Sequence, residues 1–269
     1  SNYQVNNGDI YTKTLKRSLE LVSSSNTIKI LNDNTDSSSA TVSKNVTIDT
    51  NGKTVTRTSA IDVNSNYKLI MKGTGTIYNE EFRIFNVYGT LEIQGGTYES
   101  NHDNISTIYL PESPAKLILN DINYIAIKNK FGSGSVAIKS VSTEDLDINA
   151  NASGIYIYGA QNGIYAPNAT VSVSSKYTTE NAIGVYNYIS ANFGAAIYAK
   201  NIKFGTEYDK QTEKLAYYPQ ARSYNYTSTS SREPVLKTNG GNIYFNSGDI
   251  YSNFKAGTYQ SSEANCPHP

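Results

Sequence analysis

Short apolar segments with tyrosines at matching positions recur along this chain at a nearly constant interval. Residues 154–158 read Gly-Ile-Tyr-Ile-Tyr, and residues 184–188, 30 positions later, read Gly-Val-Tyr-Asn-Tyr. Each copy leads into a second short segment, Gly-Ile-Tyr-Ala at 163–166 and Ala-Ile-Tyr-Ala at 196–199. Strands that return at a regular interval are typical of a solenoid, in which each turn of the chain stacks on the preceding one.

The N-terminal half carries the same pattern at a shorter interval. Aligning Ile61 with Ile84 gives a spacing of 23 residues, and aligning Leu69 with Leu91 gives 22. Three short strands in each interval, bent at Gly and Asn, predict a parallel β-helix. Inward residues would stack as aliphatic ladders while outward residues stay polar. We therefore expect an all-β fold, a single-stranded right-handed parallel β-helix, with residues 1–269 forming one domain.

One segment breaks the β pattern and predicts a helix, Thr12 to Ser23. Within it Leu15, Leu19 and Val22 follow the i, i+4, i+7 spacing of one helical face. The apolar end of a solenoid needs a cover, and a short amphipathic helix can supply one. We interpret residues 12–23 as the N-terminal cap.

Composition restricts the kinds of partner. The 23 basic and 23 acidic residues cancel, which argues against nucleic acid or an anionic membrane as the main partner. The single cysteine, Cys266, excludes a disulfide framework and a thiolate metal cluster. No stretch approaches the roughly 18 apolar residues of a membrane span. We expect no metal site and no cofactor.

The C-terminal part of the chain departs from the regular repeat. We expect a long insert at 206–238 and final turns of the solenoid at 240–260.

Several of these segments resemble a known family. Residues 26–31, then 44–49 and 51–55, are similar to the opening of pectin-lyase-like right-handed parallel β-helix domains, especially those of large surface proteins from Gram-positive and gut bacteria. Residues 91–98 resemble a typical turn of these domains, and the likeness covers most of 12–205. The resemblance implies an extracellular, cell-surface location. It implies little about activity, because such domains serve adhesins, carbohydrate-active enzymes and passive stalks alike.

The acidic residues next to strands are the candidates for catalysis. By the same resemblance, enzymes of this fold use either an acidic calcium cluster with a basic residue or two to three aspartates on adjacent turns. Asp145 and Asp147 would both face outward from one strand, with no matching acid one turn later and only Asp121 near one turn earlier. We assign no catalytic residue. The acids near strands are Asp62, Glu92, Asp121, Asp145, Asp147 and Asp249.

Tyrosine is the one residue type in clear excess, with 23 copies and no tryptophan. Where Ile points inward, the neighbouring Tyr must point outward. Outward tyrosines either stabilise the stacked strands through ring contacts or form a surface for a ligand or partner, since Tyr stacks on sugar rings and is common at protein interfaces. The candidate binding residues are Tyr156, Tyr158, Tyr186 and Tyr188 in strands, with Tyr217, Tyr218, Tyr224 and Tyr226 in the insert.

Two functions from different classes follow. The first is a non-catalytic, monomeric module of a bacterial cell-surface protein, serving adhesion, ligand display or as a stalk, with a glycan or a host or extracellular protein as partner. The second is a carbohydrate-active enzyme, a polysaccharide lyase or glycoside hydrolase, whose acids converge from separate turns. A trimeric, tail-spike-like receptor binder is disfavoured because no trimerising segment is evident. The missing acid cluster favours the first.

Overall fold

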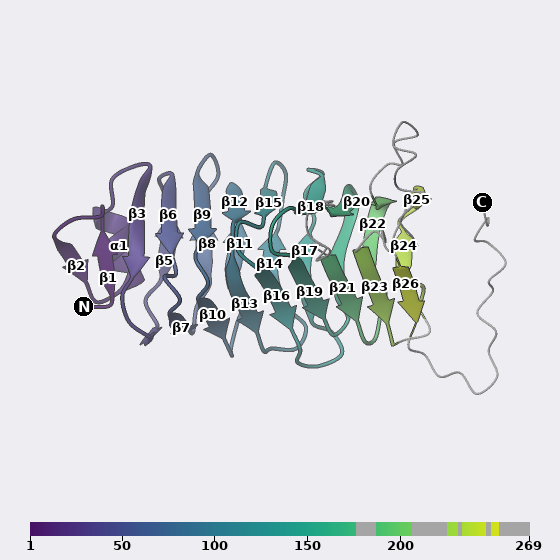
Figure 1. Cartoon of the computed structure of the whole chain (residues 1–269), viewed down its shortest axis with the longest axis horizontal. Coiled ribbons are helices and arrows are strands. Elements are labelled where there is room, and N and C mark those ends of the chain that lie inside the picture. The colour runs from purple at the N-terminus through teal and green to yellow at the C-terminus, as the bar shows by residue number, and fades with distance from the viewer. Residues whose placement is uncertain (176–186, 206–224, 231–232, 246–248, 253–269) are drawn as a thin grey trace.

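The chain forms an elongated parallel β-helix, as expected from the repeats (Figure 1). The computed structural model describes residues 1–175, 187–205, 225–230, 233–245 and 249–252. Nearly all of the regular structure is β-strand, with one short helix, α1 (Leu15–Leu21), near the N-terminus. Within these ranges, no helix has the length and apolar character required to cross a bilayer.

Each turn of the solenoid contributes strands to three faces, here called faces 1, 2 and 3. Face 1 contains β5 (Ala40–Val42), β8 (Ile61–Val63), β11 (Phe85–Val87), β14 (Ser106–Leu110), β17 (Val136–Ser140), the first parts of β20 (Asn162–Ser175) and β22 (Ile197–Phe204), and β24 (Leu236–Thr238). Face 2 contains β3 (Asn26–Ile30), β6 (Val46–Asp49), β9 (Lys68–Lys72), β12 (Thr90–Ile93), β15 (Lys116–Asn120), β18 (Leu146–Ala150), the later parts of β20 and β22, and β25 (Ile243–Phe245).

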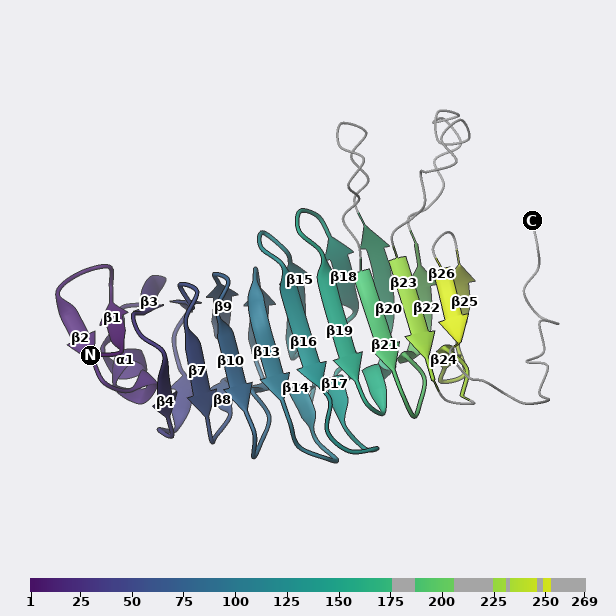
Figure 2. The ribbon, with the colours of Figure 1, turned by 60° about the horizontal axis from the view of Figure 1, so that its bottom comes forward.

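Face 3 is a separate sheet of nine parallel strands, which lies toward the viewer in Figure 2. Its strands are β4 (Asn34–Asp36), β7 (Thr54–Arg57), β10 (Thr76–Asn79), β13 (Gly96–Ser100), β16 (Ile125–Asn129), β19 (Ile155–Gly159), β21 (Asn187–Ala191), β23 (Asn225–Thr229) and β26 (Asp249–Ser252). Strands β23 and β24 lie inside the range expected as an insert, 206–238, so turns of the solenoid continue within that range.

The pairing register agrees with the sequence repeat in one strand and differs in another. Leu69 pairs with Leu91, which confirms the spacing of 22 residues. Ile61 pairs with Phe85 rather than with Ile84, so that alignment was wrong by one residue. Ile84 and Phe85 are both apolar and both buried, so hydrophobicity alone could not choose between them.

The 30-residue alignment of the tyrosine repeats was wrong by two residues. Tyr156 pairs with Tyr188, not with Tyr186, so the spacing between these turns is 32 residues. Side-chain direction in a strand repeats every two residues, and a slip of two therefore leaves the same kinds of residue facing outward. The second segment is confirmed, because Tyr165 pairs with Tyr198.

A β-hairpin closes the N-terminal end of the solenoid, which the sequence did not indicate. Strand β1 (Tyr3–Val5) pairs antiparallel with β2 (Ile10–Thr12) and also antiparallel with β3, the first strand of face 2. The hairpin thus occupies the edge of β3 that would otherwise be unpaired. Covering an edge strand in this way protects it from pairing with another chain.

The predicted capping helix is present but shorter than residues 12–23. Thr14 is its N-cap, and the Thr14 hydroxyl accepts a hydrogen bond from the Arg17 amide, so the helix begins only at Leu15. Leu15, Leu19 and Val22 are buried, as the helical spacing predicted. The helix contacts β1, β2 and β5, which places it over the same end as the hairpin.

The interior is a single column of apolar side chains from all three faces. Tyrosine also enters this column once on face 3, where Tyr98 pairs with Ile77 and Ile127 and is fully buried. Its hydroxyl donates to the Gly95 carbonyl oxygen at 2.8 Å, which satisfies the buried polar atom. The excess of tyrosine therefore serves the core as well as the surface.

A candidate binding site on face 3

The strand tyrosines of face 3 point outward, because the alternation along each strand buries their aliphatic neighbours. In β19, Ile155 and Ile157 are buried while Tyr156 and Tyr158 are half-buried. Tyr188 in β21 is half-buried in the same way. The expectation that these tyrosines lie outside the core is confirmed for these three residues.

The register of β19 and β21 places two of these rings side by side. The Tyr156 and Tyr188 rings are stacked, with centroids 5.3 Å apart and planes inclined by only 6°. Such an offset stack stabilises the pairing of neighbouring strands by about 0.5–1.5 kcal/mol beyond its buried area. The two rings therefore present a rigid aromatic surface.

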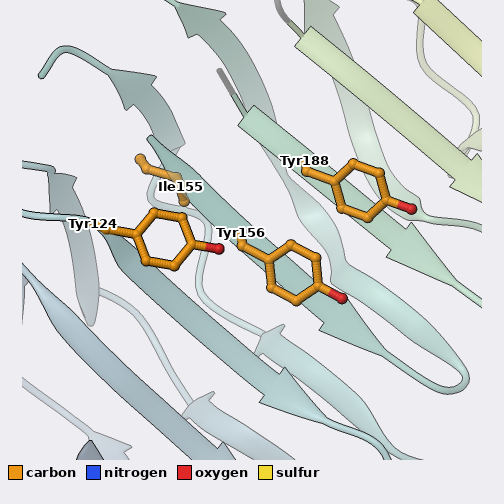
Figure 3. Close-up of a pocket in the computed structure, with 4 residues that line it drawn as sticks. All are labelled: Tyr124, Ile155, Tyr156 and Tyr188. Atoms are coloured by element: carbon orange, nitrogen blue, oxygen red, sulfur yellow. The ribbon is translucent and has the colours of Figure 1, made fainter. Parts of the chain in front are cut away.

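A surface hollow of about 320 Å³ lies next to this pair and is lined by Tyr124, Ile155, Tyr156 and Tyr188 (Figure 3). Tyr124 comes from the turn that precedes β16, and its side chain is 49% exposed. The sequence reasoning missed Tyr124. Its position directly before Ile125, whose strand pairs with that of Ile155, was the available signal.

A glycine with a left-handed backbone lies beside Tyr124 on the next turn. Because Ile125 pairs with Ile155, Tyr124 has Gly154 as its neighbour on the next turn. The Ile125 amide donates to the Gly154 carbonyl oxygen at 3.1 Å, which confirms that the two turns are adjacent here. Gly154 has φ of 103°, a conformation that residues with a side chain rarely adopt. The position beside Tyr124 therefore carries no side chain.

The hollow is chemically apolar with phenol groups at its edge. Burial, and to a smaller extent the neighbouring Tyr188, Tyr158 and Tyr124 phenols, raise the pKa of Tyr156 to about 12. The Tyr156 hydroxyl is thus protonated at neutral pH and able to donate a hydrogen bond. The Lys128 ammonium lies 5.9 Å from the centroid of the Tyr156 ring and adds a positive charge nearby.

The structure brings together only some of the predicted site residues. Tyr156 and Tyr188 line the hollow, whereas the Tyr158 hydroxyl instead accepts a hydrogen bond from the Asn192 side-chain amide. The strand residue Tyr226 pairs with Tyr188, but its side chain is outside the description. The remaining candidates lie outside the described residues: Tyr186, Tyr217, Tyr218 and Tyr224.

Asp121 is a buried candidate acid that accepts several hydrogen bonds, and its role is structural. The buried Asp121 carboxylate accepts hydrogen bonds from four consecutive backbone amides, those of residues 151–154, on the next turn. It therefore fixes the loop that ends at Gly154, beside the hollow. The same use of a side-chain acceptor between turns recurs where Asp33 binds the Thr54 amide and Asp145 binds the Thr170 amide.

Two of the other candidate acids have partners of their own. Asp62 accepts a hydrogen bond from the Asn86 side chain, and Glu92 binds Lys68 and Gln94. Burial would raise the pKa of Glu92, but these two partners lower it below the ordinary value. Asp147 is exposed on β18, and the Asp249 side chain lies outside the description. Across the described ranges, no three His, Cys, Asp or Glu side chains gather as metal ligands.

Comparison with known proteins supplies no relative. No protein-family model matches the chain, and no curated protein or solved structure matches it. The sequence and the structure together establish a parallel β-solenoid.

Proposed function

We propose that this chain is a non-catalytic module of a bacterial cell-surface protein, a pectin-lyase-like β-helix that displays a glycan-binding site on face 3. The observation that carries the proposal is the hollow lined by three tyrosines. Sugar rings have apolar faces that pack against aromatic rings, and phenol hydroxyls bond to sugar hydroxyls. The cell-surface location is supported by the sequence resemblance and by the elongated shape.

The geometry indicates how a sugar would meet the site. The Tyr156 and Tyr188 rings shield one another on their stacked faces, so a ligand meets their edges and hydroxyls. Tyr124 is the most exposed ring of the three (Figure 3). We propose that one sugar ring packs against Tyr124 while its hydroxyls bond to the phenols of the stacked pair.

The acids support a binding role rather than a catalytic one. A glycosidase needs two carboxyl groups that flank one bond, with one held as an acid by a raised pKa. Here Asp121 accepts four backbone amides, and the pKa of Glu92 is lowered by Lys68 and Gln94. These carboxylates act as hydrogen-bond acceptors within the solenoid. We therefore do not propose that Asp121 and Glu92 form a catalytic groove.

A glycan array combined with product assays tests the function. The protein is screened on the array, and the polysaccharides that bind are incubated with it and assayed for new reducing ends and unsaturated products. We expect binding without product release. We expect Tyr124→Ala to weaken binding about tenfold, equivalent to ~1.4 kcal/mol. Product release would instead support the carbohydrate-active enzyme.

Tyr67→Ala is the matched control. Tyr67 is also an exposed tyrosine in a turn, at 38% exposure, but it lies outside the hollow. Both substitutions remove a partly exposed ring, so similar melting temperatures are expected for the two variants. Equal binding by wild type and Tyr124→Ala, or equal losses in the two variants, would contradict the site on face 3.

A further inference from the structure

A second row of tyrosines follows face 1 and is interleaved with cations. One outward position of face 1 is continuous from β5 to β24, first through Thr41, Asp62 and Asn86. It then continues through β14, β17, β20, β22 and β24. We call the positions in these last five strands the face 1 column. Its members are Tyr109, Lys139, Tyr165, Tyr198 and Lys237.

Neighbouring side chains of the column contact one another along its length. The Lys139 ammonium lies 5.8 Å from the Tyr109 ring centroid and 5.8 Å from that of Tyr165. The Tyr165 and Tyr198 rings meet edge to face, with centroids 5.0 Å apart. The Lys237 ammonium lies 5.7 Å from the Tyr198 centroid. These cation–π and ring contacts hold the side chains in position before any ligand arrives.

Arg83 extends the positive character beyond Tyr109. Its guanidinium carbon lies 4.5 Å from the Tyr109 ring centroid and 5.0 Å from that of Phe82. Tyrosine and arginine are, with tryptophan, the residues most enriched at the energetic centres of protein interfaces. The three tyrosines of the column and the adjacent Arg83 are therefore residue types that favour protein binding.

The charge balance of the column is positive. Within the described ranges, Lys139 and Arg83 form no salt bridge, and both are half-buried. Lys237 is bonded to Glu233 at 2.9 Å, but that pair is exposed and therefore weak. None of the five members carries a carboxylate, whereas Asp62 occupies the same outward position two strands before Tyr109 and acts electrostatically on Arg83. The positive charge is therefore concentrated at Lys139 and Lys237, and a partner that complements these two residues carries negative charge.

The spacing of the cations matches an extended peptide. Lys139 and Lys237 are three strands apart, which corresponds to about 14 Å at roughly 4.8 Å per strand. In an extended peptide, residues i and i+4 point to the same side and are also about 14 Å apart, at roughly 3.4 Å per residue. Residue i+2 would then lie over Tyr165 and Tyr198.

We propose that the face 1 column binds an extended acidic segment of a protein partner. Acidic side chains at positions i and i+4 would pair with Lys139 and Lys237, and an apolar side chain at i+2 would pack on the two tyrosines between them. This surface lies on a different face from the glycan site and shares no residue with it. The proposal therefore goes beyond the proposed function and does not depend on it.

Labelled synthetic peptides test the proposal by fluorescence anisotropy at low and at physiological salt. One peptide carries Glu-Ser-Phe-Ser-Glu between Gly-Ser flanks, and a second has the same composition with the two glutamates adjacent. We expect the first to bind more tightly. We expect Lys139→Gln to weaken its binding about tenfold, because the variant removes the charge while keeping an unbranched polar side chain.

Lys203→Gln is the matched control, since Lys203 is an exposed lysine on the face 2 part of β22 and the net charge change is the same. Tyr165→Ala provides a second variant, with circular dichroism to confirm folding. Three results would overturn the proposal: no binding by wild type, equal losses in the two lysine variants, or no preference between the peptides. Binding of an acidic polysaccharide but of neither peptide would also overturn it.

Discussion

At the scale of single residues, the acids of this protein hold adjacent turns of the solenoid together. Asp121 shows this most clearly, because one carboxylate satisfies four backbone amides of the following loop. Asp33 and Asp145 each bind one amide in the same manner. A turn between parallel strands leaves amides without a strand partner, and an acid on the neighbouring turn satisfies them.

We predict that Asp121→Ala destabilises the protein by about 1–3 kcal/mol, because buried amides lose their acceptor. Urea unfolding monitored by circular dichroism measures the change. Asp147→Ala is the control, since Asp147 is an exposed aspartate, and its effect should remain within about 0.5 kcal/mol. Equal effects of the two substitutions would contradict the structural role of Asp121.

At the scale of elements, one buried carboxylate joins the N-terminal hairpin, the helix and the first turns. Asp36 accepts hydrogen bonds from the Tyr3 hydroxyl at 2.7 Å and from the Leu15 amide at 2.6 Å. The Arg57 guanidinium lies 3.6 Å from the same carboxylate, and both side chains are only 1% exposed. The cap is thus attached by a charged network as well as by apolar packing.

The pKa of Asp36 reflects this network. Burial alone would raise it, but hydrogen bonds from Ser38, Leu15 and Tyr3 together lower it below its ordinary value. A carboxyl whose pKa is lower in the folded state stabilises the fold above its unfolded pKa of about 3.9. That contribution is lost as the pH falls through the folded pKa.

We predict that Asp36→Asn lowers the free energy of unfolding by about 3 kcal/mol at pH 7, because it leaves the Arg57 charge buried without a carboxylate. The difference from wild type should shrink as the pH falls from about 3.9 through the lower folded pKa of Asp36, because the unfolded chain takes up the proton first and the folded carboxylate only afterwards. Urea unfolding across this pH range measures it.

The pair between Asp49 and Lys72 provides the comparison. It has the same separation of 3.6 Å but is partly exposed, and so Asp49→Asn should cost less than about 1 kcal/mol. A loss for Asp36→Asn that is constant with pH, or no larger than that of Asp49→Asn, would contradict the role of the buried network.

At the scale of the whole molecule, stability comes from stacking, because each turn contacts mainly its two neighbours. The ends of such a column are therefore its weakest points. At the N-terminal end, the hairpin pairs with β3 while α1 covers the apolar column. Together they remove an unpaired strand edge and an exposed hydrophobic surface.

We predict that deleting residues 1–22 causes aggregation, because the edge of β3 and the apolar side chains beneath α1 become exposed. Size-exclusion chromatography with light scattering compares the truncated and full chains. A soluble, monomeric truncation with the circular dichroism spectrum of the full chain would show that the cap is dispensable.

The sequence predicted the fold class because every turn of a solenoid repeats the same alternation of inward apolar and outward residues. Alternating Ile and Tyr specify which side of a strand faces the core, and Leu69 with Leu91 even indicated the correct register. The helix was recognisable from Leu15, Leu19 and Val22. The terminal hairpin was not, because its two strands pair antiparallel and do not share the repeat of the parallel turns.

The candidate site was predictable only in part. That Tyr156 and Tyr188 lie outside the core followed from the sequence by itself, since alternation along a strand is a local property. Which tyrosine stacks on Tyr156 depends on the pairing register of β19 and β21. A shift of two residues would place another outward tyrosine beside Tyr156, so the sequence pattern could not choose between the two registers. Tyr124 joins them because the turn before β16 lies beside the turn before β19. The tertiary structure alone decided these contacts, because they depend on how many residues each turn uses before the next strand begins.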